Sequence, residues 1–409
     1  MNILIVNAHS SRNKGDAGII LSMIDSIKKN VPNANIKIKT RFPEIDKDTY
    51  DVLVRECACN ISVDPDESKV TKIISALNML RRLYSKNQKI DDDYKWADVV
   101  VSCGGGFLLS HRFSPALLQH LVQLKIAFDY DKPVVIYAQS IGPFYNNIMQ
   151  KVSKRILDRV DRIFIRENIS QQWLEKIGCN NKNIVVVSDS AFCMNKQQSD
   201  YVDQLFLELK ANHEGPIIGL TARDWNFPEM EDKSQHRLRY VESMQKVILH
   251  FEEKYNAKLL LMPQVLGPNN FNDDRIISRE ILAGINSKFS QLINYDFNPR
   301  ELKYFYSKLD MFIGTRMHSN IFALSSYVPT VAINYEHKTR GIMELLELEN
   351  YVLEINHITS SDLISVAEQC WKNRDSLKNK LQRQIPQVLN SAETPAKYIA
   401  SLNKNLVHS

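Results

Sequence analysis

Glycine is scarce in this chain. The 409 residues include only 13 glycines, about half of the share found in an average protein. Three of them stand together at Gly104, Gly105 and Gly106, just after the apolar run 98–102. Such a chain is expected to place glycine where the backbone turns sharply or comes close to a ligand.

Several other features are also missing. The six cysteines form no Cys-x-x-Cys pair and have no histidine at ligand spacing, which argues against a structural zinc site and favours reduced, mostly buried thiols. No stretch reaches the roughly 18 apolar residues of a membrane helix, and residues 1–11 lack the basic start and cleavage site of a signal peptide. We therefore expect a soluble cytoplasmic protein, with at most a peripheral contact at the inner face of the membrane.

The charge is nearly balanced. The chain has 52 Lys and Arg against 47 Asp and Glu, a net charge of +5, which is too mild to indicate nucleic-acid binding.

Short apolar runs of strand length alternate with amphipathic helical patterns along most of the chain. This alternation is typical of an α/β fold with parallel sheets that helices cover on both faces. After a polar stretch near residues 196–215 the pattern restarts, so we expect two Rossmann-like parallel-sheet domains that face a cleft. The predicted division is residues 1–195, residues 215–375 and a helical C-terminal tail over residues 376–409.

The clearest chemistry lies in loops of the second half. Residues 314–320 (GTRMHSN) follow an apolar run and begin a helix, which places Arg316 and His318 at a helix N-terminus that favours anions. Arg223 and Lys338 follow two further predicted strands. Because the carboxyl ends of parallel strands share one edge of a sheet, these residues predict a small, multiply anionic ligand, and the histidine can transfer protons near neutral pH.

Loops of the first half carry a second set of candidates. Gly15 is expected to take a positive φ, and Asp16 either caps the following helix or binds a sugar hydroxyl. The triple glycine either allows tight packing of the chain or admits a ligand to the backbone. Gln139 and Ser140 stand where hydroxyl groups could be bound. The candidates for this side are Asp16, Gly104, Gly105, Gly106, Gln139 and Ser140.

In this order, the motifs NKGDAGI, GGGF, QSIGPF, TARD and GTRMHSNIFALSSYVPTVAINYEHKTRG resemble those of the polysaccharide pyruvyl transferase family, over about residues 2–345. The resemblance implies a fold of the GT-B glycosyltransferase type whose last helix packs back toward the N-terminal domain. It also implies transfer of pyruvate from phosphoenolpyruvate to a sugar of a cell-surface polysaccharide or its lipid-linked precursor. A pyruvate ketal forms and phosphate leaves, without a cofactor or metal.

The resemblance also implies roles for individual residues. The donor is expected to bind at Arg223, Arg316, the backbone of Met317, His318 and Lys338, with His318 as the catalytic acid or base. The acceptor sugar is expected at the first-half candidates, with His9, His111 and Arg112 as weaker ones.

Two alternatives stay open at this point. One is a GT-B glycosyltransferase with a nucleotide-sugar donor, in which Glu336 or Glu344 would have to bind the nucleotide. The other is a glycan-binding or scaffold protein without catalytic activity.

Overall fold

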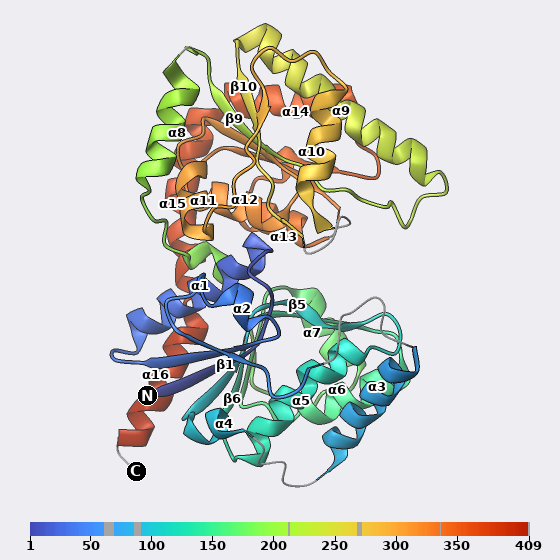
Figure 1. Ribbon diagram of the computed structural model, residues 1–409, viewed down its shortest axis with the longest axis vertical. Coiled ribbons are helices and arrows are strands. Elements are labelled where there is room, and N and C mark those ends of the chain that lie inside the picture. Colours follow the sequence, from blue (N-terminus) through green and yellow to red (C-terminus); the bar gives the residue numbers. More distant parts are fainter. Residues whose placement is uncertain (61–68, 86–90, 212, 268–271, 336, 408–409) are drawn as a thin grey trace. The chain divides into compact units, whose positions relative to one another are not determined.

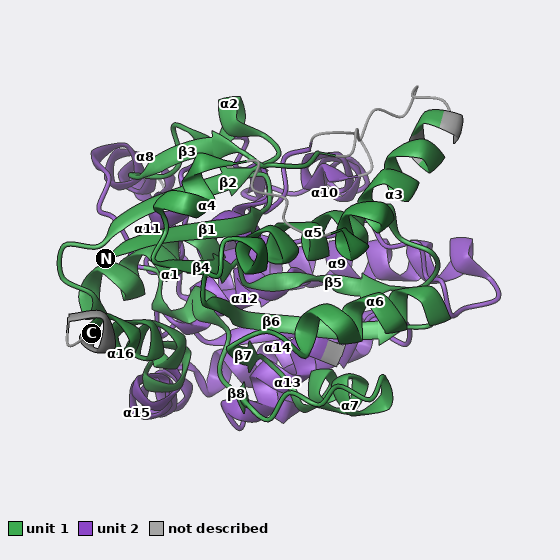
Figure 2. Ribbon diagram, turned by 90° about the horizontal axis from the view of Figure 1, so that it is seen from below, with its two compact units in different colours: residues 1–11, 19–194, 389–409 green, residues 12–18, 195–388 purple. Residues whose placement is uncertain are grey.

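The computed structural model describes residues 1–60, 69–85, 91–211, 213–267, 272–335 and 337–407 (Figure 1). These residues form two compact units, coloured green and purple in Figure 2. The first unit comprises residues 1–11, 19–194 and 389–409, and the second comprises residues 12–18 and 195–388.

The first unit is built on a parallel sheet with the strand order β3-β2-β1-β4-β6-β7-β8, and β5 pairs with β6 beside this path. Helices α1 and α16 lie on one side of the sheet, and α5 and α6 lie on the other (Figure 1). Because both faces are covered, the central strands are apolar throughout; residues 3–6 of β1, for example, are completely buried. The strands are β1 (Asn2–Ala8), β2 (Asn35–Thr40), β3 (Leu53–Glu56), β4 (Val99–Ser102), β5 (Gly105–Ser110), β6 (Val134–Phe144), β7 (Arg162–Ile165) and β8 (Ile184–Val186).

Helices connect these strands, as parallel pairing requires. They are α1 (Lys14–Asn30), α2 (Pro43–Asp46), α3 (Lys69–Tyr84), α4 (Asp92–Trp96), α5 (Pro115–Asp129), α6 (Asn147–Leu157), α7 (Asn168–Lys176) and α16 (Thr394–Val407). The start of α5 shows how the sequence sets a boundary: the Ser114 side chain accepts a hydrogen bond from the Leu117 N–H, and Pro115 occupies the first helical turn, where its missing N–H costs nothing.

The second unit contains a parallel sheet with the order β11-β10-β9-β12-β13-β14. Its strands are β9 (Ile217–Thr221), β10 (Lys258–Leu261), β11 (Gln291–Leu292), β12 (Met311–Gly314), β13 (Thr330–Asn334) and β14 (Val352–Glu354). Its helices are α8 (Asp200–Ala211), α9 (Lys233–Tyr255), α10 (Asp274–Ala283), α11 (Pro299–Tyr306), α12 (Met317–Leu324), α13 (His337–Leu345), α14 (Ser360–Lys372) and most of α15 (Arg374–Ala392).

The predicted fold class is confirmed: there are two parallel-sheet α/β units and a helical C-terminal segment. Residues 389–407 pack within the first unit, where the Ser188 N–H donates to the Ser391 hydroxyl at 3.0 Å and the Tyr398 ring lies 5.8 Å from that of Phe164. Among the described helices, none is long and apolar enough to span a membrane.

Two segments that the sequence analysis treated as loops are strands. β6 continues through Phe144, and the last two glycines of the triplet begin β5, which pairs with it. Gly105 has a φ of 141°, a conformation that side chains disfavour, and this lets the chain turn from β4 into β5. The alternation rule missed β5 because Gly105 and Gly106 supply no apolar side chain to the pattern.

Candidate functional site

Three neighbouring strands of the second unit end in loops that carry the predicted cations. β9, β12 and β13 are adjacent in the sheet, and Arg223, Arg316 and Lys338 follow them in turn. Parallel strands expose their carboxyl ends at one edge, so the fold gathers these three loops there. Lys338 lies partly exposed in the first turn of α13.

The start of α12 is held firmly. Arg316 is its N-cap residue and Met317 its first helical residue. The Ser319 hydroxyl donates to the Arg316 carbonyl at 2.6 Å and lies 2.9 Å from the Thr221 hydroxyl oxygen of β9. A side chain at Gly314 would meet the Asn320 Oδ1 atom at 1.8 Å, so position 314 requires glycine. These contacts fix the direction in which the residues at the α12 N-terminus point.

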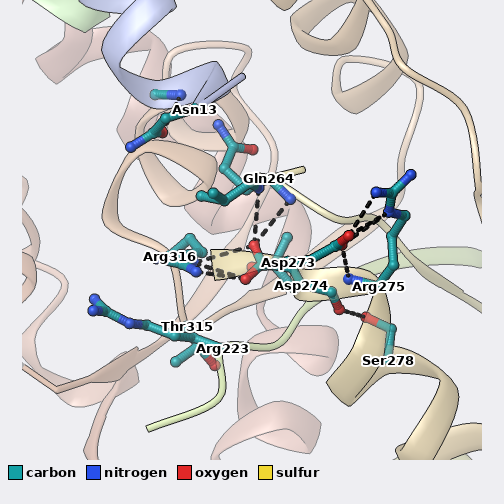
Figure 3. A network of polar contacts seen from close by, with 12 residues as sticks. Asn13, Arg223, Gln264, Asp273, Asp274, Arg275, Ser278, Thr315 and Arg316 are labelled. Carbon is teal, nitrogen blue, oxygen red and sulfur yellow. Dashed lines mark hydrogen bonds and ion pairs between the residues drawn. The ribbon is translucent and has the colours of Figure 1, made fainter. Parts of the chain in front are cut away.

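Arg316 is anchored by a buried carboxylate that the sequence analysis did not single out (Figure 3). Its Nε atom lies 3.2 and 3.1 Å from the two Asp274 oxygens, and Nη2 lies 2.5 Å from Oδ1. Asp274, at the start of α10, is 2% exposed and also accepts the N–H groups of Gln264 and Val265. Burial opposes the charge of Arg316, but the attraction and hydrogen bonds of Asp274 outweigh burial and raise the pKa of the guanidinium. The pair orients Arg316 without leaving a buried charge alone.

Arg223 is held in a different way. Its guanidinium carbon lies 4.1 Å from the ring centre of Tyr335 and 4.9 Å from that of Trp225. This cation–π arrangement holds the guanidinium without neutralising its positive charge. Its backbone N–H donates to the Tyr240 hydroxyl at 3.3 Å, and that hydroxyl lies 2.9 Å from Thr315 Oγ1. No carboxylate among the described residues forms an ion pair with Arg223. Its charge is therefore available to a ligand.

Gly15 packs directly against His318, and both belong to the second unit. A Cβ atom at position 15 would lie 2.3 Å from His318 Nδ1. The Lys14 N–H donates to the Gln264 carbonyl at 3.1 Å, which ties this segment to the loop after β10. Gly15 does not have the positive φ that the sequence suggested; the proximity of the His318 ring is what requires glycine there.

Asp16 lies in the same segment, in the first turn of α1. Its Oδ2 atom accepts from the Asn13 side chain at 2.8 Å, and Asn13 Oδ1 accepts the N–H groups of Gly15 and Asp16. Asn13 therefore caps the N-terminus of α1, a role for which the sequence analysis considered Asp16. Contacts place Asp16 with the second unit, whereas the sequence analysis grouped it with residues 1–195.

The other acceptor-side candidates lie in the first unit. A side chain at Gly104 would meet the Tyr137 carbonyl oxygen at 2.8 Å, so tight packing accounts for this glycine, whereas Gly106 is exposed. The Gln139 amide is buried and donates to the Ser140 carbonyl at 3.2 Å. The contact of these residues with an acceptor stays a prediction.

The hydroxyl of Ser140 is occupied by a strand-end network. It donates to Glu167 at 3.0 Å and accepts from Arg166 at 2.7 Å. Arg166 is in turn ion-paired with Asp189. An acceptor sugar could reach this hydroxyl only if the network rearranged.

Two further observations bear on ligands. Within the described part of the chain, no group of three or more His, Cys, Asp or Glu side chains could hold a metal ion. Glu344 is exposed on α13, and Glu336 lies outside the described residues.

Comparisons with known proteins agree with this architecture. The model of the polysaccharide pyruvyl transferase family matches residues 13–337. The amylovoran biosynthesis protein AmsJ of Erwinia amylovora is 24% identical over 404 residues, covering 95% of this chain and 96% of that protein.

Solved structures show the fold. A putative UDP-N-acetylglucosamine 2-epimerase from Listeria monocytogenes matches with a TM-score of 0.63 at 12% identity, covering 100% of this chain and 97% of that one. A glycosyltransferase from Rickettsia africae matches with a TM-score of 0.58 at 16% identity, covering 99% of each chain. The likeness to these proteins confirms the GT-B-like fold. Because the family match extends over most of the chain, the protein is an enzyme that belongs to the polysaccharide pyruvyl transferase family.

Proposed function

We propose that the enzyme transfers pyruvate from phosphoenolpyruvate to a sugar of a cell-surface polysaccharide or its lipid-linked precursor, and forms a pyruvate ketal. The observation that carries the proposal is the set of cations at three adjacent strand ends, with a histidine at the start of α12 between them. Phosphoenolpyruvate has a phosphate and a carboxylate close together, and it therefore suits several fixed positive charges. AmsJ, by its name, also serves the synthesis of a polysaccharide.

Each donor-side residue has a distinct part in this proposal. The bonds to Asp274 use Nε and Nη2 of Arg316, so Nη1 is the atom that would reach the donor. Arg223 brings a charge that no described carboxylate neutralises, and the Met317 N–H adds a donor at the positive end of a helix. Lys338 would approach the phosphate from α13.

The reaction needs proton transfer as well as charge. A proton adds to the C3 methylene of phosphoenolpyruvate, and one sugar hydroxyl attacks C2 and loses its proton. The bond from C2 to the phosphate oxygen then breaks, and a second hydroxyl attacks C2 and closes the ketal while its proton passes to the departing phosphate. We assign His318 as the group that gives or takes one of these protons, while the arginines stabilise the departing phosphate. Phosphoenolpyruvate is a substrate here, and no step calls for a cofactor.

The location follows from the acceptor. A lipid-linked sugar would bring the enzyme to the inner face of the membrane as a peripheral protein, and we include this location in the proposal.

Mass spectrometry of products tests the proposal. The enzyme is incubated with phosphoenolpyruvate and a panel of nitrophenyl and lipid-linked hexosides, and in parallel with UDP-sugars. We expect a sugar product that has gained the mass of a pyruvate ketal, together with inorganic phosphate, and near-complete loss of both with His318→Gln. Sugar transfer from a UDP-sugar, with release of UDP, would instead support the glycosyltransferase alternative.

Binding without any product would support the non-catalytic alternative. Full activity of His318→Gln would refute the role of this residue while leaving the reaction itself intact.

A further inference from the structure

Two basic residues of the first unit, His9 and Arg41, follow strands at the carboxyl edge of its sheet. β1 stands between β2 and β4, so the connections that leave β1 and β4 run to opposite sides, and ligands of open α/β sheets bind at such a switch point. His9 directly follows β1, and Arg41 directly follows β2. Neither residue has a part in the donor site described above.

Arg41 carries a charge without a counter-charge. Its side chain is half-buried, and Nη1 donates to the side-chain amide oxygen of Gln119 on α5 at 3.4 Å. Among the described residues, no carboxylate lies within ion-pair distance of this guanidinium. Burial lowers the pKa of Arg41, as expected for a cation that is partly withdrawn from water. A cation withdrawn from water in this way is stabilised by a bound anion.

His9 lies near enough to Arg41 for the charge of the guanidinium to lower its pKa. His9 lies with its ring centre 4.6 Å from Phe107 and 5.4 Å from His120. Burial, with the charge of Arg41 adding to it, lowers the pKa of His9 to about 4, so the imidazole is uncharged at neutral pH. Its buried Nε2 atom has no hydrogen-bond partner among the described residues. A neutral imidazole can donate one N–H to an anion.

The carboxylate of Asp46 acts on His9 in the opposite direction and raises its pKa. Both carboxylate oxygens of Asp46 already accept hydrogen bonds. Oδ1 accepts the Ser11 N–H at 2.8 Å, and Oδ2 accepts the Thr40 hydroxyl at 2.5 Å. Asp46 is completely buried. It therefore links the loop after β1 to the end of β2, and it forms no ion pair with Arg41.

We propose that Arg41 and His9 bind a phosphate or diphosphate group attached to the acceptor sugar. The site itself is argued from the first unit alone; only its assignment to the acceptor rests on the proposed function. Two kinds of acceptor carry such a group, because the sugar can be linked through a diphosphate either to a lipid or to a nucleoside. A free, unphosphorylated sugar would leave the site empty.

Calorimetry with inorganic pyrophosphate tests the site without knowledge of the sugar. The titration is made on the full chain saturated with phosphoenolpyruvate, so that the donor site is filled. We expect Arg41→Gln to weaken pyrophosphate binding by about tenfold or more, as for a lost charge-assisted hydrogen bond, and Arg41→Lys to weaken it less. Arg55, an exposed arginine of β3, gives the matched control: Arg55→Gln should change the affinity less than twofold. Equal binding by wild type and Arg41→Gln would overturn the proposal, as would the absence of binding to the wild-type protein whose donor site is filled.

Turnover separates the two sources of phosphate. With lipid-diphosphate and nucleoside-diphosphate sugars as acceptors, Arg41→Gln should raise the KM of the physiological one about tenfold, with kcat/KM for a nitrophenyl hexoside unchanged. An equal loss of kcat/KM with the nitrophenyl hexoside would show that Arg41 does not act by binding a phosphate group of the acceptor. If no acceptor is pyruvylated, the proposed function fails, whereas the pyrophosphate titration still decides whether the anion site exists.

Discussion

Replacement of Gly15 by alanine should displace the proposed catalytic histidine. The new Cβ atom would lie 2.3 Å from Nδ1, 2.7 Å from Cγ and 2.8 Å from Cβ of His318, whereas ordinary contact begins at 3.4 Å. The ring must therefore move about 1.1 Å away from residue 15, which is the difference between 2.3 Å and the 3.4 Å of an ordinary contact. A misplacement of roughly 1 Å costs an enzyme about 100-fold in rate. We expect Gly15→Ala to lower kcat by about this factor.

The assay compares initial rates of phosphate release on the acceptor found in the product screen, together with unfolding in urea. Gly341 gives the matched control, because a Cβ atom at this position of α13 would meet nothing within 4 Å. Gly341→Ala should keep the wild-type kcat and gain about 0.5–1 kcal/mol of stability from helix propensity. If Gly15→Ala is folded and retains more than a third of the wild-type kcat, then the position of the His318 ring does not govern the rate.

Three further predictions concern charged and titratable groups of the two units. Asp274→Asn breaks a buried ion pair and should lower the free energy of unfolding by about 3–5 kcal/mol. Asp224→Asn breaks an exposed ion pair and should lower it by less than about 1 kcal/mol. Similar losses for the two variants in urea unfolding would contradict the anchoring role of Asp274. The pKa of His9 is lowered from 6.5 to about 4 by folding, so the unfolded chain gains a proton between these pH values and stability falls as the pH falls. Between pH 7 and pH 5 this loss amounts to about 2 kcal/mol, and His9→Phe should be less acid-sensitive by that amount; an unchanged pH profile would refute the shift. Arg316→Lys keeps the charge but loses the planar fork, so the KM for phosphoenolpyruvate should rise about tenfold or more, and an unaltered KM would exclude a direct contact.

The buried strands could be predicted from the sequence because each one is a short apolar run. The apolar runs IIGLT and TVAIN of the sequence, for example, coincide with β9 and β13. The helix at Arg316 and His318 was also predicted, because an apolar run ended at Gly314 and a helical pattern followed. In these places a local pattern and the tertiary structure require the same conformation.

Asp274 could not be chosen from the sequence. Two successive aspartates at the start of α10 are a common helix-capping pattern, and Asp273 does cap that helix, since its side chain accepts the Arg275 N–H. Nothing local indicates that the second aspartate faces Arg316, which is 42 residues away in the chain. Such a contact follows only from the adjacency of β10, β9 and β12.

Gly15 illustrates another case, in which the sequence drew attention to a glycine but predicted the wrong reason for it. The sequence marked it as a turn glycine, whereas its neighbour His318, about 300 residues away in the chain, is what excludes a side chain. The segment 12–18 belongs by its contacts with the second unit although it follows the first strand of the first. The order of the residues in the chain therefore places this segment in the first unit, whereas its contacts place it in the second.

The central claim is that pyruvate from phosphoenolpyruvate becomes a ketal on a sugar, and NMR of the product tests it most directly. The donor is labelled with carbon-13 at C2, and the product is isolated after reaction with the acceptor. We predict a quaternary carbon bonded to two sugar oxygens and a methyl group, with one inorganic phosphate released for each ketal. A product that keeps the methylene group as an enol ether, or a sugar that carries no label, would contradict the account.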